Sequence, residues 1–315
     1  MKRIFTLTIA VIVSVSVFGQ QSPDLKLKLE KGKIYKLCSS SEQNIVQTIN
    51  GNQQTIESKS SYSISIKMVD ATSSFLVTEI HLDTIASFNN TMGKVSKMSS
   101  ANPGDIKSKE TTDIMSFIMN KMSKTPIYAK IDFTGKVIEI VNKKMLSDMI
   151  LKDTASMTLT GMMGSTIITQ IKNMVDESAY RTLIELFTHN LPGKAVNPGE
   201  TWTITSTTNA GGMSLEITTN SKLDKVSANN ANITAESKIK AAVNAPPMEV
   251  GGGKITYDDI SGLSKSDIII DIATGLVIQS SSKSHVTGNL GFSMPGVSLQ
   301  IPMDINSNSK ITSIQ

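Results

Sequence analysis

Residues 297–306 have the sequence Val-Ser-Leu-Gln-Ile-Pro-Met-Asp-Ile-Asn, in which apolar and polar side chains alternate without a break. Successive side chains of a β-strand point to opposite faces, so this alternation predicts a strand with one apolar and one polar face. Pro302 cannot donate a ladder hydrogen bond and therefore predicts a sheet edge or a bulge there. The same period of two recurs over residues 61–68. Antiparallel sheet is thus expected near both ends of the chain.

Turn signals lie between the alternating stretches. Asn50-Gly51 is the strongest short-range signal for a hairpin. Leucines alternate with lysines over residues 25–29, which predicts a first hairpin with residues 34–37. The polar residues 89–110 predict a loop.

Two regions change to the period of an α-helix. Residues 111–123 repeat apolar side chains at three- and four-residue spacing, and residues 143–190 contain three further stripes of this kind. Leu191-Pro192-Gly193 ends the helical block, because proline and glycine interrupt helices. The predicted class is α+β and β-rich, with curved antiparallel sheet in both halves and the helical block packed on the concave apolar face.

The first residues have the three zones of a secretory signal peptide. Lys2 and Arg3 precede an apolar stretch over residues 5–17, and Gly19 provides a small residue before a cut ahead of Gln20. The apolar stretch is shorter than the roughly 20 residues of a membrane span, which favours cleavage over an N-terminal anchor. We therefore expect residues 1–19 to be removed, no transmembrane segment in the mature protein, and export to the periplasm, the cell envelope or the extracellular space.

The remainder divides at the helix-breaking sequence. Residues 20–190 form a β-rich N-terminal half with helices, and residues 191–315 form a β-rich C-terminal half, either as two units or as one continuous domain. The single cysteine, Cys38, excludes an intramolecular disulfide. Loss of Lys2 and Arg3 lowers the formal charge from +4 to +2, and without a basic cluster we expect no nucleic-acid partner.

No stretch matches a catalytic or metal-binding motif. His81, His189 and His285 are far apart in the sequence and do not have the spacing of a zinc site. Residues 251–254, Gly-Gly-Gly-Lys, lack the spacing and the following hydroxyl of a phosphate-binding loop. We accordingly predict no catalytic residue, no metal and no cofactor, and the protein is not expected to be an enzyme.

Methionine is the most informative residue type, with 17 in the chain. Its thioether is flexible and polarizable and is used at adaptable binding surfaces, but it also fills ordinary cores and can bind Cu(I). Copper is disfavoured because no histidine or cysteine accompanies the methionines. An ordinary core and an apolar groove for a lipid-like or peptide ligand both remain open. The candidate ligand-binding residues are Met115, Met119, Met122, Met145 and Met149.

Several stretches resemble a family of uncharacterised, β-rich secreted proteins of about this length from Bacteroidota. The resemblance rests on residues 29–37, the turn at residues 47–51, Asn197-Pro198-Gly199-Glu200-Thr201-Trp202 and the hairpin at residues 271–277. It implies a domain of unknown function and carries no site residue. By analogy of fold alone, it suggests a half-barrel like those that carry lipoproteins or lipids across the periplasm.

The leading hypothesis is an exported, non-enzymatic binding protein for a hydrophobic or peptide-like ligand, such as a small apolar molecule or a lipid. The alternative is a structural or interaction module of the cell envelope without a ligand pocket. A third possibility is an enzyme whose site residues are dispersed along the chain.

Overall fold

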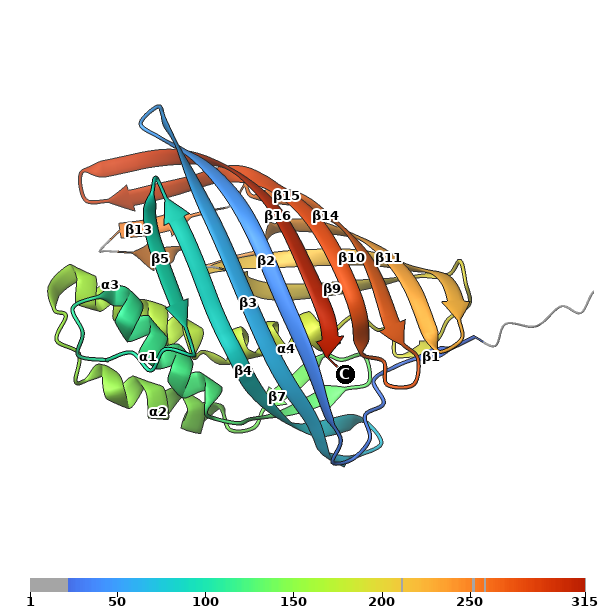
Figure 1. Cartoon of the computed structure of the whole chain (residues 1–315). Helices are drawn as coiled ribbons and strands as arrows, with labels where there is room; N and C mark the ends of the chain where they lie inside the picture. Colours follow the sequence, from blue (N-terminus) through green and yellow to red (C-terminus); the bar gives the residue numbers. More distant parts are fainter. Residues whose placement is uncertain (1–21, 211, 251–252, 258, 315) are drawn as a thin grey trace, which may run out of the picture.

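The computed structural model describes residues 22–210, 212–250, 253–257 and 259–314 (Figure 1). The expected signal peptide, residues 1–19, lies outside this range. A large antiparallel sheet curves over four α-helices in the described part of the chain. The helices are α1 (Thr111–Ser123), α2 (Lys143–Thr154), α3 (Gly161–Met174) and α4 (Glu177–Thr188).

Most of the remaining residues form strands. Those before the helical block are β1 (Asp24–Leu25), β2 (Ile34–Ile49), β3 (Asn52–Ala71), β4 (Phe75–Thr91), β5 (Lys94–Ser99), β6 (Ile127–Asp132) and β7 (Val137–Ile140). Those after it are β8 (Lys194–Ala195), β9 (Thr201–Ala210), β10 (Met213–Ser227), β11 (Asn230–Ala241), β12 (Met248–Val250), β13 (Gly253–Thr256), β14 (Ser261–Asp271), β15 (Val277–Met294) and β16 (Val297–Ile314).

The main sheet is antiparallel throughout and is not closed. Its strands follow the order β7-β6-β4-β3-β2-β16-β15-β14-β11-β10-β9, with β5 paired to β4, and β13 joining β12 to β15. The last strand, β16, pairs with β2 through contacts such as Ile305 opposite Ile45, so strands of both halves share one sheet. The β-rich α+β fold with a curved antiparallel sheet and helices on its concave side is confirmed (Figure 1).

Two apolar clusters lie on the concave side of the sheet. The larger one joins the sheet to the four helices and includes Leu37, Ile64, Ile80, Ile118 and Ile171, all fully buried. A smaller cluster lies at the other end of the strands and is centred on Leu215, Tyr257, Ile260 and Met303. Burial of apolar surface in the larger cluster is the main favourable term that holds the helices against the sheet.

Helix α4 bridges the gap between the two edge strands, β7 and β9. The Val137 N–H donates to Glu185 Oε1 over 2.9 Å, and the Arg181 guanidinium donates to the carbonyls of Val137 and Ile138. On the other side, Thr208 Oγ1 of β9 donates to Thr182 Oγ1 over 3.2 Å. An unpaired strand edge presents free backbone donors and acceptors, and α4 side chains satisfy those of β7.

Two local predictions are wrong. Residues 25–29 do not form a hairpin with residues 34–37. Instead, β1 pairs with β8. The Leu27 N–H donates to Phe133 O in the turn after β6, and the Lys28 N–H donates to Thr274 O in the turn after β14, so this segment contacts both turns. The polar loop expected over residues 89–110 begins later, because β4 and β5 form a hairpin through Met92 and Gly93, which adopt φ of 51° and 83°.

Pro302 lies at the position where the pairing between β16 and β2 ends. β16 has β2 and β15 as neighbours from Met303 onward, whereas Pro302 is paired only with Asn289 of β15. The missing N–H of proline therefore lies at a local edge of an otherwise central strand, as the sequence predicted. Among the described helices, none has the length and apolar character required to cross a membrane.

Candidate ligand-binding cavity

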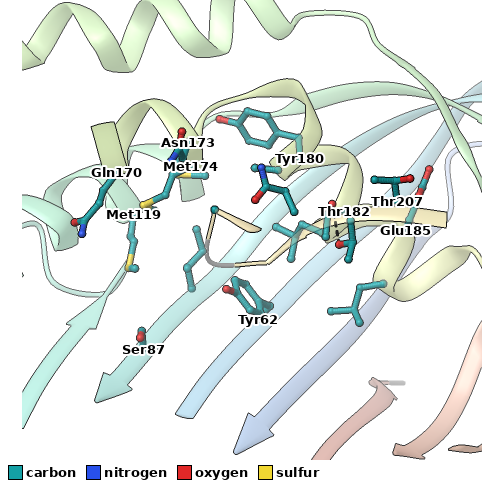
Figure 2. A pocket seen from close by; sticks show the side chains of 18 of the residues that line it. Tyr62, Ser87, Met119, Gln170, Asn173, Met174, Tyr180, Thr182, Glu185 and Thr207 are labelled. Atoms are coloured by element: carbon teal, nitrogen blue, oxygen red, sulfur yellow. Dashed lines mark hydrogen bonds between the residues drawn. The ribbon is translucent and has the colours of Figure 1, made fainter. Parts of the chain in front are cut away.

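A cavity of about 700 Å³ lies between the concave face of the sheet and helices α1, α3 and α4 (Figure 2). Tyr62 of β3 and Ile85 of β4 form part of its floor, and residues of β9 and β10 continue the wall. Ligand pockets of proteins usually have volumes of about 300–1,000 Å³, so this space has the volume of a small-molecule pocket. The periodicity of the strands and of the amphipathic helices builds the cavity, since both turn apolar side chains toward the concave side.

Three of the five methionines predicted as binding residues lie together on the cavity wall. Met115, Met119 and Met122 are buried at 6–7% exposure and project from one face of α1. Met98 of β5 and Met174 of α3 also line the cavity, although the sequence analysis did not select them.

The structure does not place Met145 or Met149 among the lining residues. Helix α2 turns Leu146 and Ile150 toward the core, which leaves Met145 half exposed, whereas Met149 packs at the margin of the larger cluster near Thr125. The stripe on α2 therefore serves packing, and the sequence alone could not show that α2 lies away from the cavity.

Glu185 and His189 contribute a carboxyl group and an imidazole to the lining. Glu185 lies in the last turn of α4, and His189 is the residue that caps its C-terminus. Glu185 Oε2 lies 3.8 Å from His189 Nδ1, and the two side chains are 13% and 9% exposed. Burial raises the pKa of Glu185, although the hydrogen bond from the Val137 N–H opposes this. Burial also lowers the pKa of His189, which favours a neutral imidazole. No lysine or arginine is among the described lining residues.

Tyr180 of α4 presents a buried hydroxyl without a hydrogen-bond partner among the described residues. The side chain is 2% exposed and belongs to the cavity lining (Figure 2). A buried hydroxyl without a partner costs about 1–3 kcal/mol, and Oη of Tyr180 is itself buried from solvent although the residue belongs to the lining. Burial raises the pKa of both Tyr180 and Tyr62, which keeps both phenols protonated at neutral pH.

Exposed polar side chains lie at both ends of the cavity as Figure 2 shows it. Gln170 and Asn173 of α3 lie near Met119, and Thr207 of β9 lies with Glu185 at the opposite end of the view (Figure 2). Leu186 of α4, 41% exposed, also belongs to the lining.

The other two histidines, His81 and His285, are not among the lining residues. His81 pairs with Glu79, and His285 with Asp304, each over 2.9 Å between neighbouring positions of the sheet. Within the part of the chain that the structure describes, no group of three or more histidine, cysteine, aspartate or glutamate side chains could hold a metal ion.

Sequence reasoning missed Glu185, Tyr180 and Tyr62. Tyr180 belongs to an apolar stripe that the sequence did show, but its unpartnered hydroxyl depends on the tertiary packing. The spacing of Glu185 and His189, four residues apart at the end of a helix, was a local signal that could have identified the pair.

The fold and the cavity define a class of β-rich proteins in which an open antiparallel sheet encloses a space beneath helices. The model of a family described as "Family of unknown function (DUF6263)" matches residues 77–277, and the chain belongs to that family. No curated protein matches the sequence.

Solved structures show distant likenesses. A structure titled for lipid–protein interactions in lipovitellin matches with a TM-score of 0.47 and 8% identity over 91% of this chain, which corresponds to 26% of the lipovitellin chain. An outer membrane channel from Pseudomonas putida F1 has a TM-score of 0.26 at 8% identity and covers 91% of this chain and 97% of its own. A DUF1329 family protein from Desulfovibrio piger has a TM-score of 0.13 at 9% identity, with 88% and 84% covered. At these values the likenesses assign neither a ligand nor an activity.

Proposed function

We propose that this protein is an exported, non-enzymatic binding protein that holds a hydrophobic ligand in the cavity between its sheet and its helices. The observation that carries the proposal is the wall of Met115, Met119 and Met122 on a cavity of about 700 Å³. The methionine side chains give this partly open cavity an apolar wall, and methionine adapts its shape to varied apolar surfaces.

Several features support binding over catalysis. The buried Glu185 and His189 are separated by more than a hydrogen-bond distance, and Glu185 Oε1 is engaged by the Val137 N–H of β7. This hydrogen bond accounts for the position of Glu185, which belongs to the contact between α4 and β7.

We further propose that residues 1–19 direct export and are then removed, and that the protein acts in the periplasm, the cell envelope or outside a bacterium of the Bacteroidota. Lys2, Arg3 and the apolar residues 5–17 support this proposal. Intact-mass measurement of protein recovered from the envelope fraction tests it. A mass that corresponds to a chain starting at Gln20 is expected, and an uncut leader would refute it.

Binding of Nile red, an uncharged apolar fluorophore, tests the ligand proposal. Saturable binding with one site per chain is expected. Met119→Gln places an amide in the apolar wall, and we expect it to weaken binding about tenfold, which corresponds to about 1.4 kcal/mol. Met145→Gln makes the same chemical change on α2 outside the cavity, and it should leave binding unchanged.

A second variant covers the case in which Met119→Gln impairs folding. Leu186 lines the cavity but is 41% exposed, so Leu186→Gln should preserve the fold and still weaken Nile red binding. Absence of saturable binding by the folded wild-type protein would refute the proposal and would favour the alternative, an envelope module without a ligand.

A further inference from the structure

The concave face of the sheet carries a band of serine side chains across six neighbouring strands. The strand register places one serine of each strand opposite the next, from β4 through β3, β2, β16 and β15 to β14. We call this row the serine band; its members are Ser87, Ser60, Ser41, Ser309, Ser282 and Ser266.

The orientation of the band follows from the alternation of the strands. Ser60 and Ser87 are each two residues from a side chain of the cavity floor, Tyr62 and Ile85, and therefore lie on the same face as these. All members except Ser87 are outside the cavity lining, and Ser87 belongs to both. The intervening residues on the opposite face, including Lys59 and Lys283, are exposed. With strands about 4.8 Å apart, the band is roughly 24 Å long and starts at the cavity.

A second polar row runs beside the serine band. Ser307, Ser284, Ser264 and Ser237 are paired in series from β16 to β11, and Ser237 continues to Thr219 of β10. The two rows separate the larger apolar cluster from the smaller one at the far end of the strands. The hydroxyls of the two rows are half-buried, and some bond to each other: Ser264 Oγ lies 2.9 Å from Ser282 Oγ, and Thr219 Oγ1 lies 2.8 Å from Ser237 Oγ.

Buried polar atoms without partners occur beside both ends of this surface. Tyr180 Oη is one of them, and it belongs to the lining of the cavity at which the serine band begins. The other is the indole Nε1 of Trp202, a residue of β9 that is 8% exposed. The register continues the row of the serine band from Ser266 to Ala235, then to Ser221 and finally to Trp202. Each of these groups is a hydrogen-bond donor that the described side chains leave without a partner, and each is itself buried from solvent.

We propose that the serine band is a headgroup subsite, and that the ligand is a single-chain amphiphile whose headgroup is uncharged and carries hydroxyl groups. This inference rests on the proposed function and specifies the class of ligand. The alkyl chain packs against Met115, Met119 and Met122, and the headgroup lies on the part of the serine band that begins at Ser87.

The chemistry of the surface selects against charge. A serine hydroxyl donates and accepts at once, which matches another hydroxyl, whereas a carboxylate or phosphate only accepts. The lining offers no lysine or arginine to neutralise an anion, and Glu185 repels one. A cationic head would satisfy Glu185 but would meet no further charge along the band.

Three amphiphiles with the same twelve-carbon chain test the inference below their micelle concentrations. These are 1-lauroylglycerol, laurate and dodecyltrimethylammonium, each used to displace Nile red from the full mature protein. We expect 1-lauroylglycerol to bind at least tenfold more tightly than either charged compound. Tighter or equal binding of laurate or of the cation would overturn the proposal.

A matched pair of variants locates the headgroup. Ser60→Val removes one hydroxyl of the serine band and suits a β-strand, so the fold should be retained. It should weaken 1-lauroylglycerol binding about fivefold and change Nile red binding less than twofold. Ser61→Val makes the same change on the opposite face and should have no effect. If both variants behave alike, or if Nile red binds and 1-lauroylglycerol does not, the headgroup subsite is refuted, whereas failure of Nile red itself refutes the proposed function.

Discussion

Arg181 provides the sharpest test of how the open sheet is closed. Its guanidinium donates to Val137 O and Ile138 O on the free edge of β7, and it pairs with Glu177 one turn earlier on α4 over 3.0 Å. Arg181→Met keeps an unbranched side chain, although a shorter one, removes the donors and leaves two edge carbonyls without these partners. Because the Arg181 side chain is 29% exposed, the substitution mainly probes the contact between α4 and β7.

The magnitude follows from the contacts. A hydrogen bond that involves a charged group contributes about 1.5–3 kcal/mol net when it is buried. The Arg181 side chain is 29% exposed, so we take the lower part of that range for the two carbonyl contacts together and add less than about 0.5 kcal/mol for the pair with Glu177. The expected loss of unfolding free energy is about 2 kcal/mol, equivalent to a decrease in Tm of roughly 3–4 °C for a chain of this size.

Urea denaturation followed by the fluorescence of Trp202, the single tryptophan, measures this loss. Lys172→Met, which removes a positive charge from an exposed position of α3, is the control and should change the unfolding free energy by less than about 0.5 kcal/mol. An Arg181→Met variant as stable as the control would show that α4 does not satisfy the edge of β7.

Three further predictions concern the core, one turn and the pH dependence. Ile118→Ala removes a fully buried side chain of α1, and chemical denaturation should show a loss of about 2–5 kcal/mol; a loss below 1 kcal/mol would contradict the packing of α1 on the sheet. Gly135→Ala forces a Cβ to within 1.9 Å of Thr188 O at φ +87°, so it should cost at least about 1–3 kcal/mol, whereas Gly51→Ala, which meets open space at φ +78°, should cost less by the same assay. Because burial lowers the pKa of His189 below 6.5, the unfolded chain binds more protons than the folded chain between the folded pKa and 6.5. Stability should therefore fall as the pH decreases from 7.5 through that window, and His189→Gln should reduce this fall. The raised pKa of Glu185 acts in the opposite direction, so Glu185 does not cause the fall. A His189→Gln variant with the same pH profile as the wild-type protein would exclude His189 as the source.

Local periodicity was sufficient to predict the helices and most strands. The apolar spacing over residues 111–123 matches α1, and three stripes within residues 143–190 correspond to α2, α3 and α4. The Asn50-Gly51 turn is present, with both residues at positive φ. These features depend on side chains close in the sequence, so the sequence contains the information needed to predict them.

Features that depend on distant segments could not be predicted in this way. Leu25, Leu27 and Leu29 alternate as a strand would, but their burial comes from lying across turns more than 100 residues away. Met145 has the same helical spacing as Met119, and only the placement of α2 distinguishes an exposed thioether from one on the cavity wall.

The serine band could not be predicted from the sequence either, although one local pattern indicated its members. The face that is apolar at Ile64 and Ile66 becomes polar at Ser60 and Ser58 within one strand, so a rule of one apolar face and one polar face fails along β3. Three Ser-Lys-Ser sequences, at residues 58–60, 264–266 and 282–284, repeat this polar period of two on separate strands. Their alignment into rows required the register of the sheet.

The central claim is that an amphiphile occupies the space against the methionines of α1, and methyl NMR of ¹³C-labelled methionine tests it most directly. Titration with 1-lauroylglycerol should shift the ε-methyl signals of Met115, Met119 and Met122, with those of the exposed Met145 and Met162 unchanged. Signals assigned by single substitution that move only at exposed methionines, or that do not move at all at saturating ligand, would contradict the account.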